Sequence, residues 1–220
     1  MKIQQFIKSL NNTELGKGNA HETYVSVPKK TDIGLIFDPA TTTNDINLDI
    51  LDLISVNKLD KIRYGFKKAN KEYRITGLGS YYRKNDVNAG DEIIFERRDE
   101  GRKTTFFINL NQKSNIISFQ KSTKGFEVLN MGRLLPMLTD GVYESDVLFQ
   151  ENKSTFTIEF KEKAYKRSDS PELTSFYDLK INNKSILTQY KKDDRIQLEI
   201  NSNISTLKKT IPWQHYKFNI

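Results

Sequence analysis

The feature of this sequence that most limits its fold is the recurrence of short apolar segments at intervals of about ten residues. Ile93–Phe95, Phe176–Ile181 and Ile196–Ile200 are three of these segments, and polar residues typical of turns follow each one. Segments of this length match β-strands better than helices. The pattern therefore predicts a mainly β protein with short helices, arranged as a sandwich or barrel, and argues against a parallel sheet with alternating helices.

Two hairpins are predicted from pairs of neighbouring segments. Ile62–Phe66 and Tyr73–Thr76 flank the turn-forming residues 67–71, which indicates an antiparallel pair. Thr104–Leu110 and Asn115–Phe119 are expected to form the second hairpin.

Helices are expected to be few and short. Residues 78–87 and 131–138 each have room for one or two helical turns. Asp45–Ile54 spaces its apolar residues so that either a short amphipathic helix or an irregular strand is possible. A boundary near Lys121–Gly125 would divide the chain into a domain of residues 1–120 and a second, β-rich part of residues 121–220.

Composition excludes several classes of protein before any motif is considered. The 220 residues include no cysteine, so disulfide bonds, zinc–thiolate sites and thiol nucleophiles are excluded. The first residues lack the apolar core of a secretory signal, and no apolar run approaches the ~20 residues that a membrane-spanning helix needs. We therefore expect a cytoplasmic protein without a cofactor.

Positive charge is concentrated in one stretch, Lys61–Lys84. The chain has a formal net charge of +7, and this stretch alone contains eight Lys and Arg residues against a single acid, Glu72. Aromatic residues are interleaved with these cations, and the predicted hairpin would present donors suited to DNA phosphates and guanine edges. These donors are Lys67, Lys68, Asn70, Lys71 and Arg74. A solvated basic hairpin, or one that meets an acidic protein partner, would have the same composition.

A second polar segment, Gly16–Glu22, leads directly into the predicted strand Tyr24–Val27. Its glycines let the backbone bend closely, and several of its side chains are able to meet the edge of a base. These side chains belong to Lys17, Asn19 and His21. Lys29 and Lys30 follow the strand and would join the basic hairpin if strand and hairpin are neighbours. An ordinary surface loop is the alternative for this segment.

The order of these segments resembles the B3 DNA-binding domain, in the form found in restriction enzymes such as the N-terminal domain of the EcoRII-type endonuclease. Four landmarks carry the resemblance over roughly residues 1–120. They are the polar arm with His21, the strand ending in Pro28-Lys29, the hairpin sequence Lys71–Gly77 and, after a short helix, Gly90–Arg98. The resemblance implies an open seven-stranded pseudobarrel, followed here by a small β-rich subdomain. It also implies site-specific binding of double-stranded DNA through two arms in the major groove.

By this resemblance the N-arm is Glu14–Glu22 and the C-arm is Phe66–Arg74. The bases would be read by Lys17, Asn19, His21, Lys68, Asn70, Lys71 and Arg74. The phosphates would be contacted by Lys29, Lys30, Lys67, Arg83 and Lys84.

The layout is also similar to the DNA-reading subunit of an McrB-like, GTP-driven restriction complex of the LlaJI type. That similarity implies two partners besides DNA, a downstream GTPase or AAA-type motor module and a separate nuclease subunit. The 220 residues contain no Walker A pattern, so the motor is not within them. The expected function is that of the target-recognition module of a restriction system, without catalysis of its own.

The alternative is a small Mg-dependent restriction endonuclease with its site in the second half. Asp146, Glu159 and Lys161 follow a D…ExK order, in which two carboxylates hold Mg²⁺ and the lysine helps to activate water. The solvent face of any strand with alternating acids and bases gives the same letters. His21 and His215 are too few for a histidine-based metal site, and we predict no metal-binding residue beyond this weak candidate.

Overall fold

The computed structural model describes residues 1–17, 22–27, 46–68, 72–165 and 173–220 of the chain. The protein is mainly β with short helices, which confirms the predicted fold class. The chain forms two compact units, one of residues 1–112 with 212–220 and the other of residues 113–211. The second unit thus begins close to the boundary expected near residue 121. The last residues, which the sequence assigned to the second part, return to the first unit.

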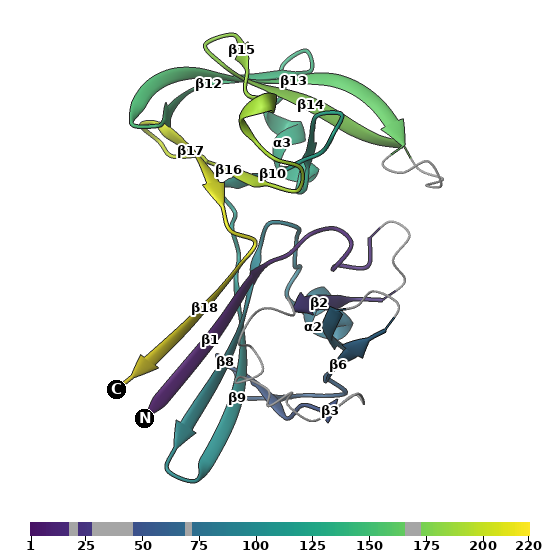
Figure 1. Cartoon of the computed structure of the whole chain (residues 1–220), viewed down its shortest axis with the longest axis vertical. Helices are drawn as coiled ribbons and strands as arrows, with labels where there is room; N and C mark the ends of the chain where they lie inside the picture. Colours follow the sequence, from purple (N-terminus) through teal and green to yellow (C-terminus); the bar gives the residue numbers. More distant parts are fainter. Residues whose placement is uncertain (18–21, 28–45, 69–71, 166–172) are drawn as a thin grey trace. The chain divides into compact units, whose positions relative to one another are not determined.

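One sheet of the first unit has the strand order β18-β1-β8-β9-β4-β5. Its four longest strands lie side by side in Figure 1, with the two chain termini at neighbouring strand ends. The strands are β1 (Lys2–Ser9), β4 (Ile50–Asp52), β5 (Lys58–Leu59), β8 (Glu92–Glu100), β9 (Lys103–Asn111) and β18 (Trp213–Asn219).

This sheet corrects one predicted hairpin. β9 pairs with β8 across a tight turn at Gly101, whose φ is +60°. The expected pairing of Thr104–Leu110 with Asn115–Phe119 is therefore wrong, because the later segment belongs to the second unit. Of the segment Asp45–Ile54, the described residues from Ile46 onward include two short strands, which favours the irregular strand over the helix.

The other sheet of the first unit has the order β2-β7-β6-β3. Its strands are β2 (Tyr24–Val27), β3 (Ile46–Asn47), β6 (Arg63–Lys67) and β7 (Glu72–Thr76). β6 and β7 are antiparallel, so the predicted hairpin around residues 67–71 is confirmed. The short helix α2 (Gly79–Lys84) follows it within the predicted range. Figure 1 shows this small sheet and α2 on one side of the long strands, and Val25, Ile75, Phe6 and Phe95 are buried in the core of the unit.

In the second unit seven strands close into a barrel, in the order β11-β10-β16-β17-β12-β13-β14 with β14 paired back to β11. They are β10 (Ile116–Lys121), β11 (Phe126–Val128), β12 (Val142–Phe149), β13 (Asn152–Tyr165), β14 (Leu173–Ile181), β16 (Arg195–Glu199) and β17 (Ser205–Thr210). Phe119, Phe156 and Leu198 are among the buried residues of its core. The short strand β15 (Lys184–Ser185) pairs antiparallel with the end of β14. A closed barrel thus stands in residues 113–211, whereas an open pseudobarrel was expected in residues 1–120.

Closure of the barrel depends on a close approach of two strands. Phe126 of β11 lies opposite Tyr177 of β14. A Cβ on the preceding Gly125 would lie 2.9 Å from the Tyr177 carbonyl oxygen, so a larger residue would push the strands apart. The remaining short helices are α3 (Met131–Leu134), which lies in the predicted range, η1 (Leu135–Met137) and η2 (Leu187–Gln189). None of the helices in the described ranges is long and apolar enough to cross a membrane.

Candidate nucleic-acid interface

The sheet β2-β7-β6-β3 joins the two segments that the sequence singled out. β2 follows the polar N-terminal segment, and β6 with β7 forms the basic hairpin. β2 is antiparallel to β7, with Tyr24 opposite Thr76 and Val27 opposite Tyr73. The strand and the hairpin are therefore neighbours, as the sequence analysis required.

The two segments meet the sheet at different ends of β2. The N-terminal segment reaches β2 at Tyr24, whereas the hairpin turn follows Lys67, next to the end at Val27. Three residues of extended strand separate these ends, which corresponds to about 10 Å. The sheet therefore fixes both the order and the spacing of the two segments.

Polar and apolar side chains alternate along the strands of this sheet, so one of its faces is polar. Residues opposite one another in an antiparallel pair share a face, and the next pair points the other way. The apolar face carries Val25, Val27, Tyr64 and Ile75, all buried. The polar face carries Tyr24, Ser26, Arg63, Gly65, Lys67, Glu72, Arg74 and Thr76.

Arg74 is the most firmly held side chain of the polar face. Its Nε donates to Glu72 Oε1 at 2.7 Å, and its Nη2 lies 2.6 Å from the same oxygen. Its guanidinium carbon lies 3.7 Å from the centre of the Tyr24 ring. Ser26 Oγ donates to the other oxygen of Glu72 at 2.8 Å. Burial raises the pKa of Tyr24 and the Arg74 guanidinium opposes that rise, so the ring stays a neutral platform at ordinary pH.

The start of the predicted N-arm is anchored by a buried carboxylate. Glu14 is 1% exposed, and its Oε1 lies 2.9 Å from Lys8 Nζ, which is buried as well. The same carboxylate accepts hydrogen bonds from the backbone N–H groups of Asn11 at 3.1 Å and Ser26 at 3.0 Å. The Glu14 carbonyl oxygen accepts from Tyr24 N at 3.0 Å. Glu14 thus ties the beginning of the N-arm to the backbone of β2, a role that no local sequence pattern indicates.

Most of the other predicted site residues within the described ranges are exposed. Lys17, Lys68, Arg83 and Lys84 are exposed, and Lys67 is half-buried. Asn19, His21, Lys29, Lys30, Asn70 and Lys71 lie outside the described residues.

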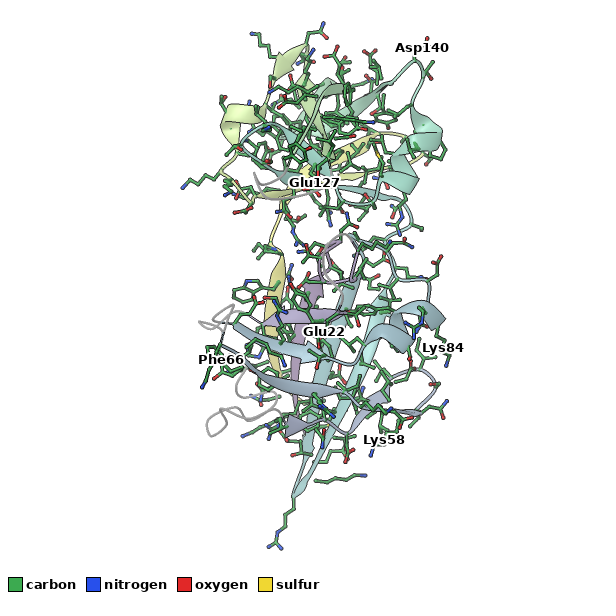
Figure 2. All side chains as sticks on the ribbon, turned by 90° about the vertical axis from the view of Figure 1, so that its right-hand side faces the viewer. Glu22, Lys58, Phe66, Lys84, Glu127 and Asp140 are labelled. Carbon is green, nitrogen blue, oxygen red and sulfur yellow. The ribbon has the colours of Figure 1, made fainter. Side chains whose placement is uncertain are left out.

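Among the residues that the structure describes, the exposed cations of the hairpin and of α2 lie apart. Figure 2 shows Phe66, at the base of the hairpin turn, and Lys84, at the end of α2, at opposite edges of the first unit, with Glu22 between them. Arg83 of α2 also has a local partner, because its Nη2 donates to Ser80 Oγ at 3.3 Å. The hairpin and α2 therefore offer positive charge on two sides of the sheet.

The residues of the nuclease alternative are not brought together. Glu159 of β13 lies opposite Val142, the first residue of β12, whereas Asp146 stands four residues further along β12. Four residues of strand correspond to roughly 13 Å, too far for two carboxylates to share an ion that binds oxygen at about 2.1 Å. Each acid instead pairs with a lysine, Asp146 with Lys153 at 2.9 Å and Glu159 with Lys180. Within the described ranges no cluster of three His, Asp or Glu side chains could hold a metal ion.

The fold and this face define the class of protein only broadly, as a mainly β protein of two units with a polar sheet face beside a basic hairpin. No protein-family model matches the chain, and comparison with curated proteins finds no match.

Proposed function

We propose that the first unit binds double-stranded DNA at a specific sequence, with the N-arm and the C-arm entering the major groove. The observation that carries the proposal is the pairing of β2 with β7, which gives the two polar segments one scaffold. Loops held by a rigid scaffold commonly carry binding specificity. The spacing of about 10 Å along β2 is comparable with the ~12 Å width of the major groove.

The charge distribution supports the same proposal. The stretch Lys61–Lys84, which includes β6, β7 and α2, holds eight cations and one acid. Arg74 forms an ion pair with that acid, Glu72. Cations on the hairpin and on α2 would then contact phosphates on the two sides of the sheet, and such contacts fix orientation without reading sequence. Lys67, Lys68, Arg83 and Lys84 belong to this set among the described residues.

In this proposal the protein is the target-recognition module of a restriction system, as the resemblance to the B3 domain implies. Translocation and cleavage belong to partners, a GTPase or AAA-type motor module and a separate nuclease subunit. The wide separation of Asp146 and Glu159 supports the assignment of cleavage to another subunit.

Selection from a library of randomised duplexes, with and without Mg²⁺, tests the proposal. We expect one short sequence to be enriched under both conditions, with the duplexes left intact. No enrichment at low salt would contradict DNA recognition and favour an acidic protein partner of the basic hairpin. Mg-dependent cleavage by the isolated chain would contradict the assignment of cleavage to another subunit.

A further inference from the structure

We infer that Arg74 reads a guanine in the target, and that Glu72 and Tyr24 hold its side chain in the reading position. The inference rests on the proposed function and adds the identity of one recognised base. The polar contacts of Arg74 among the described residues use one side of its guanidinium, the side that carries Nε and Nη2.

A guanidinium has five N–H donors in a planar fork. Glu72 takes the Nε donor and lies against Nη2, which leaves both hydrogens of Nη1 and one of Nη2. Within the described part of the chain Arg74 has no polar partner besides Glu72. None of its nitrogens is a fully buried donor without a hydrogen bond. The Arg74 side chain is 14% exposed, and the outer edge of its guanidinium keeps two parallel donors that have no polar partner among the described residues.

Two parallel donors match the O6 and N7 acceptors of guanine in the major groove. They also match two phosphate oxygens, so the surroundings of Arg74 must decide between these ligands. The Glu72 carboxylate touches the guanidinium and cancels its net charge. A phosphate would be repelled by that carboxylate, whereas the neutral edge of a guanine still gains two directed hydrogen bonds. The pair Arg74–Glu72 is thus suited to a base and poorly suited to the DNA backbone.

Tyr24 and Ser26 make this arrangement rigid before any ligand arrives. The guanidinium carbon lies 3.7 Å from the centre of the Tyr24 ring, and Ser26 Oγ donates a hydrogen bond to the second oxygen of Glu72. A long arginine side chain normally loses rotamer freedom when it binds, and holding it in place beforehand reduces that loss. Gly65 lies opposite Arg74 on β6, so the position directly across from Arg74 on this strand carries no side chain.

The test uses the duplex selected from the randomised library, with each guanine replaced in turn by 7-deazaguanine. This analogue keeps Watson–Crick pairing but lacks the N7 acceptor. We expect one guanine at which the analogue weakens binding of the unaltered protein by about 5- to 10-fold. In Arg74→Ala the same replacement should change binding by less than about 2-fold, because the partner of N7 is gone.

Two further variants separate reading from folding. Arg74→Lys keeps the positive charge and loses the fork, so it should lose most of the discrimination against 7-deazaguanine even if Arg74→Ala unfolds. Glu72→Gln removes the negative charge, so it should raise affinity for random duplexes while lowering discrimination at that guanine. Arg63→Ala removes an exposed cation from the same sheet face. It should weaken the binding of all duplexes by the same factor.

The outcomes distinguish the inference from the function on which it rests. If no duplex is enriched, the proposed function fails and the inference with it. If a duplex is enriched but contains no guanine sensitive to the analogue, or if Arg74→Ala and Arg74→Lys keep the full discrimination, DNA recognition stands and the reading role of Arg74 is wrong.

Discussion

The two units carry similar net charges but arrange them differently. Residues 1–112 with 212–220 contain nineteen Lys and Arg against fifteen Asp and Glu, and residues 113–211 contain sixteen against thirteen. On the barrel, lysines stand beside carboxylates of neighbouring strands or turns, as in Lys208–Glu199 and Lys209–Asp194, both at 2.7 Å. The first unit also has local ion pairs, but its stretch Lys61–Lys84 contains eight cations and a single acid.

This difference shows that net charge says little about partners and that segregation of charge says more. Alternating charges cancel within a few ångströms, whereas a one-sign stretch produces a field that attracts an opposite polyion over about a Debye length, ~8 Å at physiological salt. The first unit has such a stretch, next to a polar sheet face. The barrel carries local ion pairs between neighbouring strands and turns, so its charges are balanced without a ligand.

The largest expected effect is the loss of stability when the buried ion pair of the first unit, Lys8–Glu14, is broken. Lys8→Met leaves Glu14 as a buried carboxylate without its cation and should lower the free energy of unfolding of the first unit by about 3–5 kcal/mol. Lys153→Met is the matched variant on the barrel, because the pair Lys153–Asp146 is exposed, and it should cost about 0–1 kcal/mol. Chemical denaturation followed by circular dichroism measures both. Equal costs would contradict an anchoring role for Glu14.

A smaller effect is expected from the turn that ends β7. Gly77 has a φ of +86°, and a Cβ there would lie 2.3 Å from the Lys61 carbonyl oxygen. Gly77→Ala should therefore lower the free energy of unfolding by roughly 2–4 kcal/mol and loosen the basic hairpin with it. Gly101→Ala is the control, since its φ is +60° but its Cβ would meet nothing within 4 Å. That control should cost only about 1–2 kcal/mol, and an equal loss in both variants would show that the steric contact is unimportant.

The smallest effect is a pH dependence of the barrel. The pKa of Asp194 lies below its ordinary value of 3.8 because Lys209 donates a hydrogen bond to the carboxylate, and the backbone N–H of Lys191 adds another. A lowered pKa contributes stability above pH 3.8, and this contribution disappears as the pH falls through the pKa of the folded state. Thermal unfolding from about pH 5 to about pH 2 should therefore show a shallower loss of stability in Asp194→Asn than in the unaltered protein. Asp140→Asn, at an exposed turn, should follow the unaltered protein.

The sequence predicted those parts of the fold that depend on neighbouring residues. The hairpin β6–β7 was predicted because polar turn-forming residues 67–71 separate two alternating segments. The β8–β9 pair was missed because the charged residues Glu96–Lys103 suggested a turn, whereas Glu96–Glu100 continue β8 and the turn itself is at Gly101. The return of Trp213–Asn219 to pair with β1 was also missed, since local periodicity contains no information on a partner two hundred residues away.

For the candidate site, the sequence indicated which strand segment carries Arg74 but not which residues support its side chain. Arg74 was expected on the C-arm, but its support by Tyr24 depends on the pairing of β2 with β7. One local signal was present, because Glu72 and Arg74 are two residues apart and so share a strand face. The anchoring role of Glu14 had no such signal, because its partners Lys8 and Ser26 come from different strands.

The most direct test of a DNA-binding surface in the first unit, and not on the barrel, compares two double variants in a salt titration of DNA binding. With about six phosphates neutralised, log K of the unaltered protein should fall with log salt at a slope of roughly −5. Lys67→Ala with Lys68→Ala should reduce the size of that slope by about 2, whereas Lys208→Ala with Lys209→Ala should leave it unchanged. Equal slopes for the two double variants, or a loss confined to the barrel pair, would contradict the account.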